Sequence, residues 1–168
     1  MRSIAAVAVS LLALSGCSTQ VSETAIVSQA QLETQVSALF TAADPEVEVV
    51  ATCAGDLGAR VGATQDCHLD IGKQDADVRV RVTEIVGKQT KFVTTPFVPA
   101  TRVAKNIARS LRKQGYRVDQ VVCQSELIGE VGAKAICVLA PADRDGKVRA
   151  KVKSVKGLKV NFDYRVLG

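Results

Sequence analysis

The chain has 168 residues, of which 47% are hydrophobic and 23% charged, a composition that excludes a wholly disordered or low-complexity protein. It carries a formal net charge of +5, with one His, no Trp and 4% aromatic residues. Scarce aromatic side chains argue against nucleic-acid binding by base stacking, and a single His argues against general acid–base catalysis.

The N-terminus resembles the export signal of a bacterial lipoprotein. Arg2 precedes an apolar run from Ile4 to Leu14 of roughly 11 residues, too short to cross a bilayer as a helix. Leu14-Ser15-Gly16-Cys17 resembles a lipobox, whose cysteine thiol accepts a diacylglycerol carrying fatty acids such as palmitate. An ordinary secretory signal with an incidental cysteine is the alternative. We predict a signal peptide over 1–16, lipidation at Cys17, a tether over 17–23 and attachment to the extracytoplasmic face of the cell membrane.

The other four cysteines form two equally spaced pairs. Cys53 and Cys67 are 14 residues apart, and so are Cys123 and Cys137, 70 residues further on. The flanking residues repeat at the same offset, as Val61-Gly62-Ala63 and Val131-Gly132-Ala133 show. This indicates an internal duplication and predicts the disulfides Cys53–Cys67 and Cys123–Cys137 in an exported chain. Structural zinc is disfavoured because neither copy has closely spaced ligands, so we expect no metal and no cofactor.

Each copy begins with a predicted amphipathic helix. In the first copy Leu32, Val36 and Phe40 recur every four residues, before Asp44-Pro45. In the second copy the helix opens at Pro99 and Thr101 and closes at Gly115, and its apolar positions are Val103, Ile107 and Leu111.

Strands follow each helix. One strand leads into the first cysteine, its partner carries the second, and the next strand alternates apolar and basic residues, as in Val148-Arg149-Ala150-Lys151-Val152. A hairpin glycine at 87 or 157 precedes the last strand. The fold class is therefore α+β, with two tandem repeats that each pack a helix on a small antiparallel sheet of about four strands with one internal disulfide. Pro96 and Pro99 limit helix and ladder formation, and we place the repeats at 24–95 and 96–168.

This arrangement resembles a known family. A lipobox, a helix, a cysteine, Leu-x3-Val-Gly-Ala, a second cysteine and basic alternating strands are similar to the domain of unknown function numbered 4333, common in actinobacterial exported and lipid-anchored proteins. The resemblance covers two copies over residues 24–168. It implies a fold and a compartment, and no catalytic residues.

No catalytic or calcium motif stands out. The sequence has no Gly-x-Ser-x-Gly elbow, phosphate-binding glycine loop or His-Glu-x-x-His helix, so we expect that the protein is not an enzyme. The predicted turns Asp75-Ala76-Asp77 and Asp143-Arg144-Asp145-Gly146 lack the spacing of a calcium loop, and hairpin turns are the simpler reading. His68 is interpreted as a solvated strand residue rather than a ligand or catalytic group.

Charge divides between the copies. Residues 18–97 carry 6 Lys/Arg and 11 Asp/Glu, a net of −5, whereas residues 98–168 carry 15 and 6, a net of +9. Five cations fall in one arc of the second helix, which is either a solvated face or a binding surface for anions. They are Arg102, Lys105, Arg109, Arg112 and Lys113.

Two functions fit these features. The first is a non-catalytic, lipid-anchored envelope protein whose partners are the membrane, through its lipid, and an anionic envelope polymer, lipid headgroups or an acidic protein, but no nucleic acid. The alternative is an inhibitor or accessory protein of an exported enzyme, since tandem α+β repeats with one disulfide each resemble the beta-lactamase inhibitory protein in architecture.

Overall fold

The computed structural model describes residues 26–41, 46–140 and 146–167. It is an α+β structure with two helices and three antiparallel sheets. We refer to residues 26–98 as the first half and to residues 99–167 as the second half. The first half contains β1 (Ile26–Val27), α1 (Gln29–Thr41), β2 (Val49–Cys53), β3 (Leu57–Gly58), β4 (Thr64–Ile71), β5 (Gln74–Val86) and β6 (Gln89–Val98). The second half contains α2 (Ala100–Lys113), β7 (Gln120–Cys123), β8 (Leu127–Ile128), β9 (Lys134–Ala140), β10 (Lys147–Lys156) and β11 (Lys159–Leu167).

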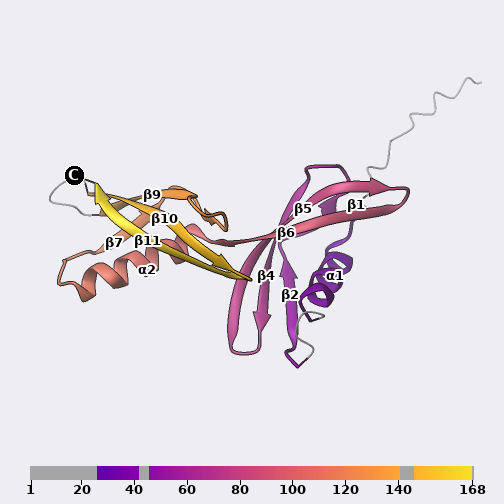
Figure 1. Ribbon diagram of the computed structural model, residues 1–168, viewed down its shortest axis with the longest axis horizontal. Coiled ribbons are helices and arrows are strands. Elements are labelled where there is room, and N and C mark those ends of the chain that lie inside the picture. The colour runs from indigo at the N-terminus through magenta and orange to yellow at the C-terminus, as the bar shows by residue number, and fades with distance from the viewer. Residues whose placement is uncertain (1–25, 42–45, 141–145, 168) are drawn as a thin grey trace, which may run out of the picture.

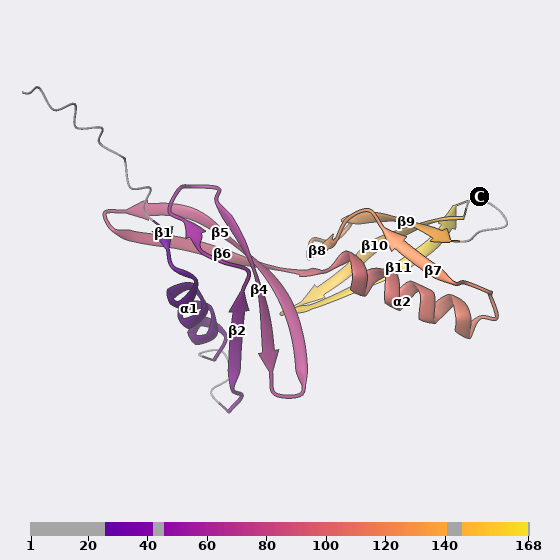
Figure 2. The same ribbon diagram turned by 180° about the vertical axis from the view of Figure 1, so that it is seen from behind.

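The first sheet has the strand order β2-β4-β5-β6-β8, and the second sheet has the order β11-β10-β9-β7. A two-stranded sheet pairs β1 with β3. Figures 1 and 2 show two lobes that meet where β6 runs into α2, with α1 beside the first sheet and α2 beside the second. The predicted sheet of about four strands is found in the second half. The first sheet gains a fifth strand because β8 of the second half joins it.

Both helices bury the apolar stripe that the sequence predicts. Leu32 and Val36 of α1 pack in one core with the inner face of the first sheet. Val103, Ile107 and Leu111 of α2 pack in a second core with the inner face of the second sheet. The α2 helix ends as expected, because Gly115 adopts a φ of +88°, which favours a glycine at a helix C-terminus.

The hairpins β5–β6 and β10–β11 share one register. Val78 lies opposite Pro96, and Val148 lies opposite Val166, 70 residues later in both strands. Each hairpin also has an irregularity at the corresponding place, after Val82 and after Val152. Gly87 and Gly157 open the two turns with positive φ, which confirms the predicted hairpin glycines.

Two predictions about local structure are wrong. Pro96 does not end the ladder, because β6 continues to Val98, and the Pro96 carbonyl accepts the N–H of Gly129 at 2.7 Å. A proline keeps its acceptor although it lacks a donor, so it fits a strand position that needs only the carbonyl. Asp75-Ala76-Asp77 is not a turn, because it lies within β5. The other predicted acidic turn, 143–146, lies mostly outside the described residues.

Candidate functional site

The exposed face of α2 presents three cations in one row. Lys105, Arg109 and Lys113 follow one another at i, i+4 and i+8, and all three are exposed. None of them forms an ion pair with any residue that the structure describes. Helix α2 contains no Asp or Glu, so the three cations repel one another at i, i+4 spacing. A bound anion would relieve this repulsion.

The other two cations of the predicted arc have partners within the chain. Arg102 pairs through Nη2 with the carboxylates of Asp75 and Asp77 in β5, the latter at 3.1 Å. Arg112 donates from Nε and Nη2 to the backbone carbonyls of Val118 and Asp119, both at 2.9 Å. The structure therefore brings Lys105, Arg109 and Lys113 together as free cations, whereas Arg102 joins the two halves and Arg112 holds the loop after α2.

His68 belongs to the same acidic cluster as Arg102. Its Nδ1 lies 2.9 Å from Oδ1 of Asp77, and its Nε2 lies 3.6 Å from Oδ1 of Asp70. The strand position that the sequence predicts is correct, but the ring has carboxylate partners as well as solvent. Of the residues described, no group of three or more His, Cys, Asp or Glu could hold a metal ion.

Both predicted disulfides are present. Cys53–Cys67 joins β2 to β4, and Cys123–Cys137 joins β7 to β9. Each pair lies directly opposite in its antiparallel ladder, with Cα–Cα distances of 3.9 and 3.8 Å. The repeated spacing of 14 residues is thus sufficient to find the pairing.

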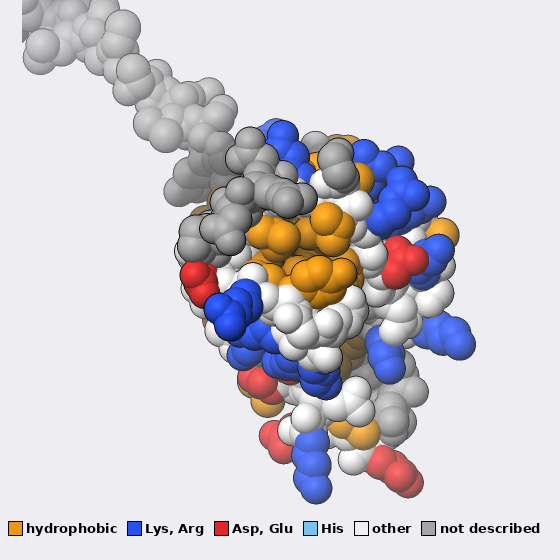
Figure 3. Space-filling view, turned by 90° about the vertical axis from the view of Figure 1, so that its left-hand side faces the viewer, with side chains coloured by type: hydrophobic (Ala, Val, Ile, Leu, Met, Phe, Trp, Pro, Cys, Tyr) orange, Lys and Arg blue, Asp and Glu red, His pale blue; other side chains and the backbone are white. Residues whose placement is uncertain are grey.

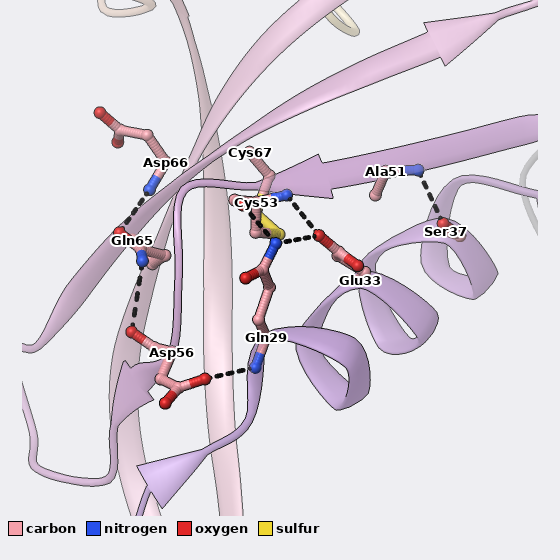
Figure 4. Close-up of a disulfide and its surroundings, with 9 residues drawn as sticks. All are labelled: Gln29, Glu33, Ser37, Ala51, Cys53, Asp56, Gln65, Asp66 and Cys67. Carbon is pink, nitrogen blue, oxygen red and sulfur yellow. Dashed lines mark hydrogen bonds between the residues drawn. A yellow bond between two sulfur atoms is a disulfide. The ribbon is translucent and has the colours of Figure 1, made fainter.

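Polar side chains of α1 bond the free edge of β2 around the first disulfide (Figure 4). The Glu33 carboxylate accepts the N–H of Cys53 at 2.9 Å, and Gln29 donates from Nε2 to the Cys53 carbonyl at 2.9 Å. Ser37 accepts the N–H of Ala51 through Oγ at 2.9 Å. The backbone hydrogen bond from Cys53, followed by the one from Gln29, lowers the pKa of Glu33.

The matching side chains of α2 are alanines. If Val103 is aligned with Leu32, then Ala104 and Ala108 take the places of Glu33 and Ser37. A shallow groove lies there between α2 and the edge strand β7, lined by Ala104, Lys105, Ala108, Arg112 and Val121 among others. The groove contains two cations, Lys105 and Arg112, and one carboxylate, Asp119, and the Arg112 guanidinium already donates to backbone carbonyls. Lys105 is therefore the cation of this groove that has no partner among the described residues.

The outer face of the second sheet is also basic. Arg149 and Lys151 of β10, with Lys134 of β9 and Arg165 of β11, line one hollow on this face. Lys153 lines it too, but pairs with Asp163 at 3.2 Å. In the first sheet the corresponding Arg79 is neutralised by Asp66, and Ile136 stands where that aspartate would be. The positive charge of the second half therefore lies on two surfaces, the exposed face of α2 and the outer face of the second sheet.

The predicted lipidation site, Cys17, lies outside the described residues, as do the signal peptide and the tether. Within residues 26–41, 46–140 and 146–167, neither helix has the length and hydrophobicity needed to cross a membrane.

Residues 12–87 match the family model described as "Domain of unknown function (DUF4333)". This confirms the resemblance for the segment that ends in the β5–β6 turn. Comparison with curated proteins and with solved structures found no match.

Proposed function

We propose that this protein is a non-catalytic, lipid-anchored envelope protein whose second half binds an anionic surface at the extracytoplasmic face of the cell membrane. In this proposal the chain consists of two copies of one α+β unit, at 24–95 and 96–168. The second copy departs from the first mainly by its added cations. The shared hairpin register and the two equivalent disulfides support the duplication.

The row of Lys105, Arg109 and Lys113 is the observation that carries the binding function. A cation near an anionic membrane surface contributes on the order of 1 kcal/mol, and the attraction fades over about 10 Å in physiological salt. A lipid at Cys17 would hold the chain at such a surface. Arg102 and Arg112 contribute less, because their guanidinium groups already have partners in the chain.

A charge-removal experiment tests the binding surface. The full chain carrying Cys17→Ser, which has no lipid acceptor, is mixed with vesicles of anionic or of neutral phospholipid. We expect salt-sensitive binding to anionic vesicles only. Replacing Lys105, Arg109 and Lys113 with Gln should weaken it on the order of 100-fold, since three contributions of about 1 kcal/mol are lost.

The matched control removes the same charge from the first half. Lys73, Arg81 and Lys88 are exposed, and their replacement with Gln lowers the net charge equally. This variant should bind almost as the parent does. Equal loss in both triple variants, or no binding to anionic vesicles at low salt, would contradict the proposal. Retention by isolated cell wall instead of vesicles would identify a polymer as the ligand.

The anchor is tested separately. Cys17→Ser should move the protein from the detergent phase to the aqueous phase, because neither described helix is long and apolar enough to span a bilayer. Partitioning identical to that of the parent would rule out lipidation at Cys17.

A further inference from the structure

The C-terminal end of β11 has an open edge, whereas the corresponding end of β6 is covered. Strand β6 lies between β5 and β8, whereas among the described strands β11 is the last one of its sheet. Because β6 and β11 share their register, Pro96 and Phe97 correspond to Val166 and Leu167. The second half therefore exposes a surface that the first half keeps occupied.

The occupant of the β6 surface is a short extended segment of the second half. Strand β8 pairs with the end of β6, where Leu127 lies opposite Val98 and Ile128 opposite Phe97. The N–H of Gly129 then donates to the Pro96 carbonyl at 2.7 Å. A Cβ on Gly129 would lie 2.5 Å from that carbonyl oxygen, so the approach requires glycine.

An acidic residue of the same segment meets an arginine of the sheet. Glu126, one residue before β8, lies 3.0 Å from Nη1 of Arg79, whose guanidinium stacks 5.2 Å from the centre of the Phe97 ring. Arg149 is the corresponding residue of the second sheet. It is only partly exposed, and no carboxylate pairs with it among the residues described.

The inner face of β11 is only partly covered. In the first half, Leu158 from the β10–β11 turn packs against the core. In the second half, Leu111, Tyr116, Phe162, Tyr164 and Val166 line an open pocket between α2 and β11. Tyr116 and Val166 are 60% and 48% exposed. Figure 3, which faces this end of the molecule, shows a hydrophobic area bordered by Lys and Arg side chains.

We infer that the open edge of β11 is a strand-addition site for an extended acidic polypeptide. The segment would carry a carboxylate for Arg149, then two strand-forming residues, the second of which lies opposite Leu167, and then a glycine whose N–H donates to the Val166 carbonyl. Unlike Pro96, Val166 keeps its backbone N–H. Main-chain hydrogen bonds supply affinity in this mode of recognition, and side-chain positions supply selectivity.

A second copy of this chain is a poor occupant. Its own segment 126–129 is engaged on β6, and the corresponding β3 is paired with β1. Asp56, the counterpart of Glu126, accepts the N–H of Gln29 at 2.7 Å. Ala59 stands in the place of Gly129 and would bring a Cβ against the β11 carbonyl. The occupant is therefore a different protein, which fits an inhibitor or accessory role and does not depend on membrane binding by α2.

The chain's own segment provides the probe. A fluorescent peptide with the sequence of residues 124–131 is titrated with the full chain, and binding is measured by anisotropy. A photoreactive group on the peptide should crosslink to Tyr164–Leu167. The Glu126→Gln peptide should bind about tenfold more weakly, because it loses one charge-assisted hydrogen bond. The Gly129→Ala peptide should not bind measurably.

Variants of the chain complete the test. Arg149→Gln should weaken binding of the parent peptide about tenfold. It should have little effect on binding of the Glu126→Gln peptide, because the two substitutions remove the same ion pair. Lys151→Gln, which removes a cation from the same strand face, should change the affinity less than threefold. Equal binding of the Gly129→Ala peptide, equal effects of the two variants, or crosslinking elsewhere would overturn the site. Self-association of the chain through β11, or binding of polyphosphate but not of the peptide, would also overturn it.

Discussion

At the scale of single residues, Arg79 binds one carboxylate from each half. Its Nε and Nη2 meet both carboxylate oxygens of Asp66 at 2.7 and 2.8 Å, while Nη1 reaches Glu126. Hydrogen bonding to Asp66, helped by Glu126, raises the pKa of Arg79 above its usual range despite partial burial. The guanidinium therefore stays charged at any pH at which the protein folds.

Replacing Arg79 with Gln should lower the free energy of unfolding by about 1–3 kcal/mol, because three charge-assisted hydrogen bonds are lost and Glu126 is left without its partner. Chemical denaturation measures this change. Arg81→Gln is the matched control, since Arg81 follows on the same face of β5 but is exposed. If both variants lowered the free energy of unfolding equally, the effect would come from the loss of a positive charge on β5 and not from the contacts of Arg79.

Glu33 should make stability depend on pH. Its folded pKa is lowered, so its hydrogen bonds to Cys53 and Gln29 stabilise the fold above the unfolded pKa of about 4.3 and are lost as the pH falls through the folded pKa. Unfolding curves between pH 7 and pH 3 should therefore decline less steeply for Glu33→Gln than for the parent. Glu130→Gln, at an exposed position, should leave the decline unchanged. If the stability of Glu33→Gln declined between pH 7 and pH 3 as steeply as that of the parent, this role of Glu33 would be contradicted.

At the scale of elements, the contact between β6 and β8 depends on a glycine. Gly129→Ala would place a Cβ against the Pro96 carbonyl, so β8 must shift away from β6, at a cost of about 1–3 kcal/mol. Gly58→Ala, in the corresponding strand β3, meets only an ordinary contact at 3.8 Å and should change stability by less than about 0.5 kcal/mol. Denaturant midpoints compare the two. A tolerated Gly129→Ala would show that β8 is not held closely to β6.

The sequence predicts elements well because their patterns are local. Alternation along β10 and four-residue spacing along α2 assign Val148 and Ile107 to the core without knowledge of the fold. Contacts between halves are not local. The helical angle of Arg102 places it in the cationic arc of α2, but Asp75 and Asp77 pair with it from β5. The pairing of β6 with β8 was missed for a related reason, since Pro96 uses a carbonyl rather than the N–H whose absence suggested a boundary.

At the scale of the whole molecule, the two halves share a hairpin register and a disulfide position but differ in how their charges are paired. In the first half, Glu33 accepts a hydrogen bond from the edge strand β2, and Asp66 forms an ion pair with Arg79. The second half has Ala104 and Ile136 at the corresponding positions, which leaves backbone edges and cations open. Charge asymmetry between similar folds is thus the feature that points to binding by the second half.

Lysine footprinting on membranes tests this claim most directly. The full chain carrying the proposed lipid at Cys17 is bound to anionic or to neutral vesicles and acetylated briefly, and the modified lysines are quantified by mass spectrometry. Lys105 and Lys113 should react more slowly on anionic vesicles, while the exposed Lys73 and Lys88 of the first half should react equally on both. Equal reactivity of Lys105 and Lys113 on the two surfaces, or stronger protection of Lys73 and Lys88, would contradict the account.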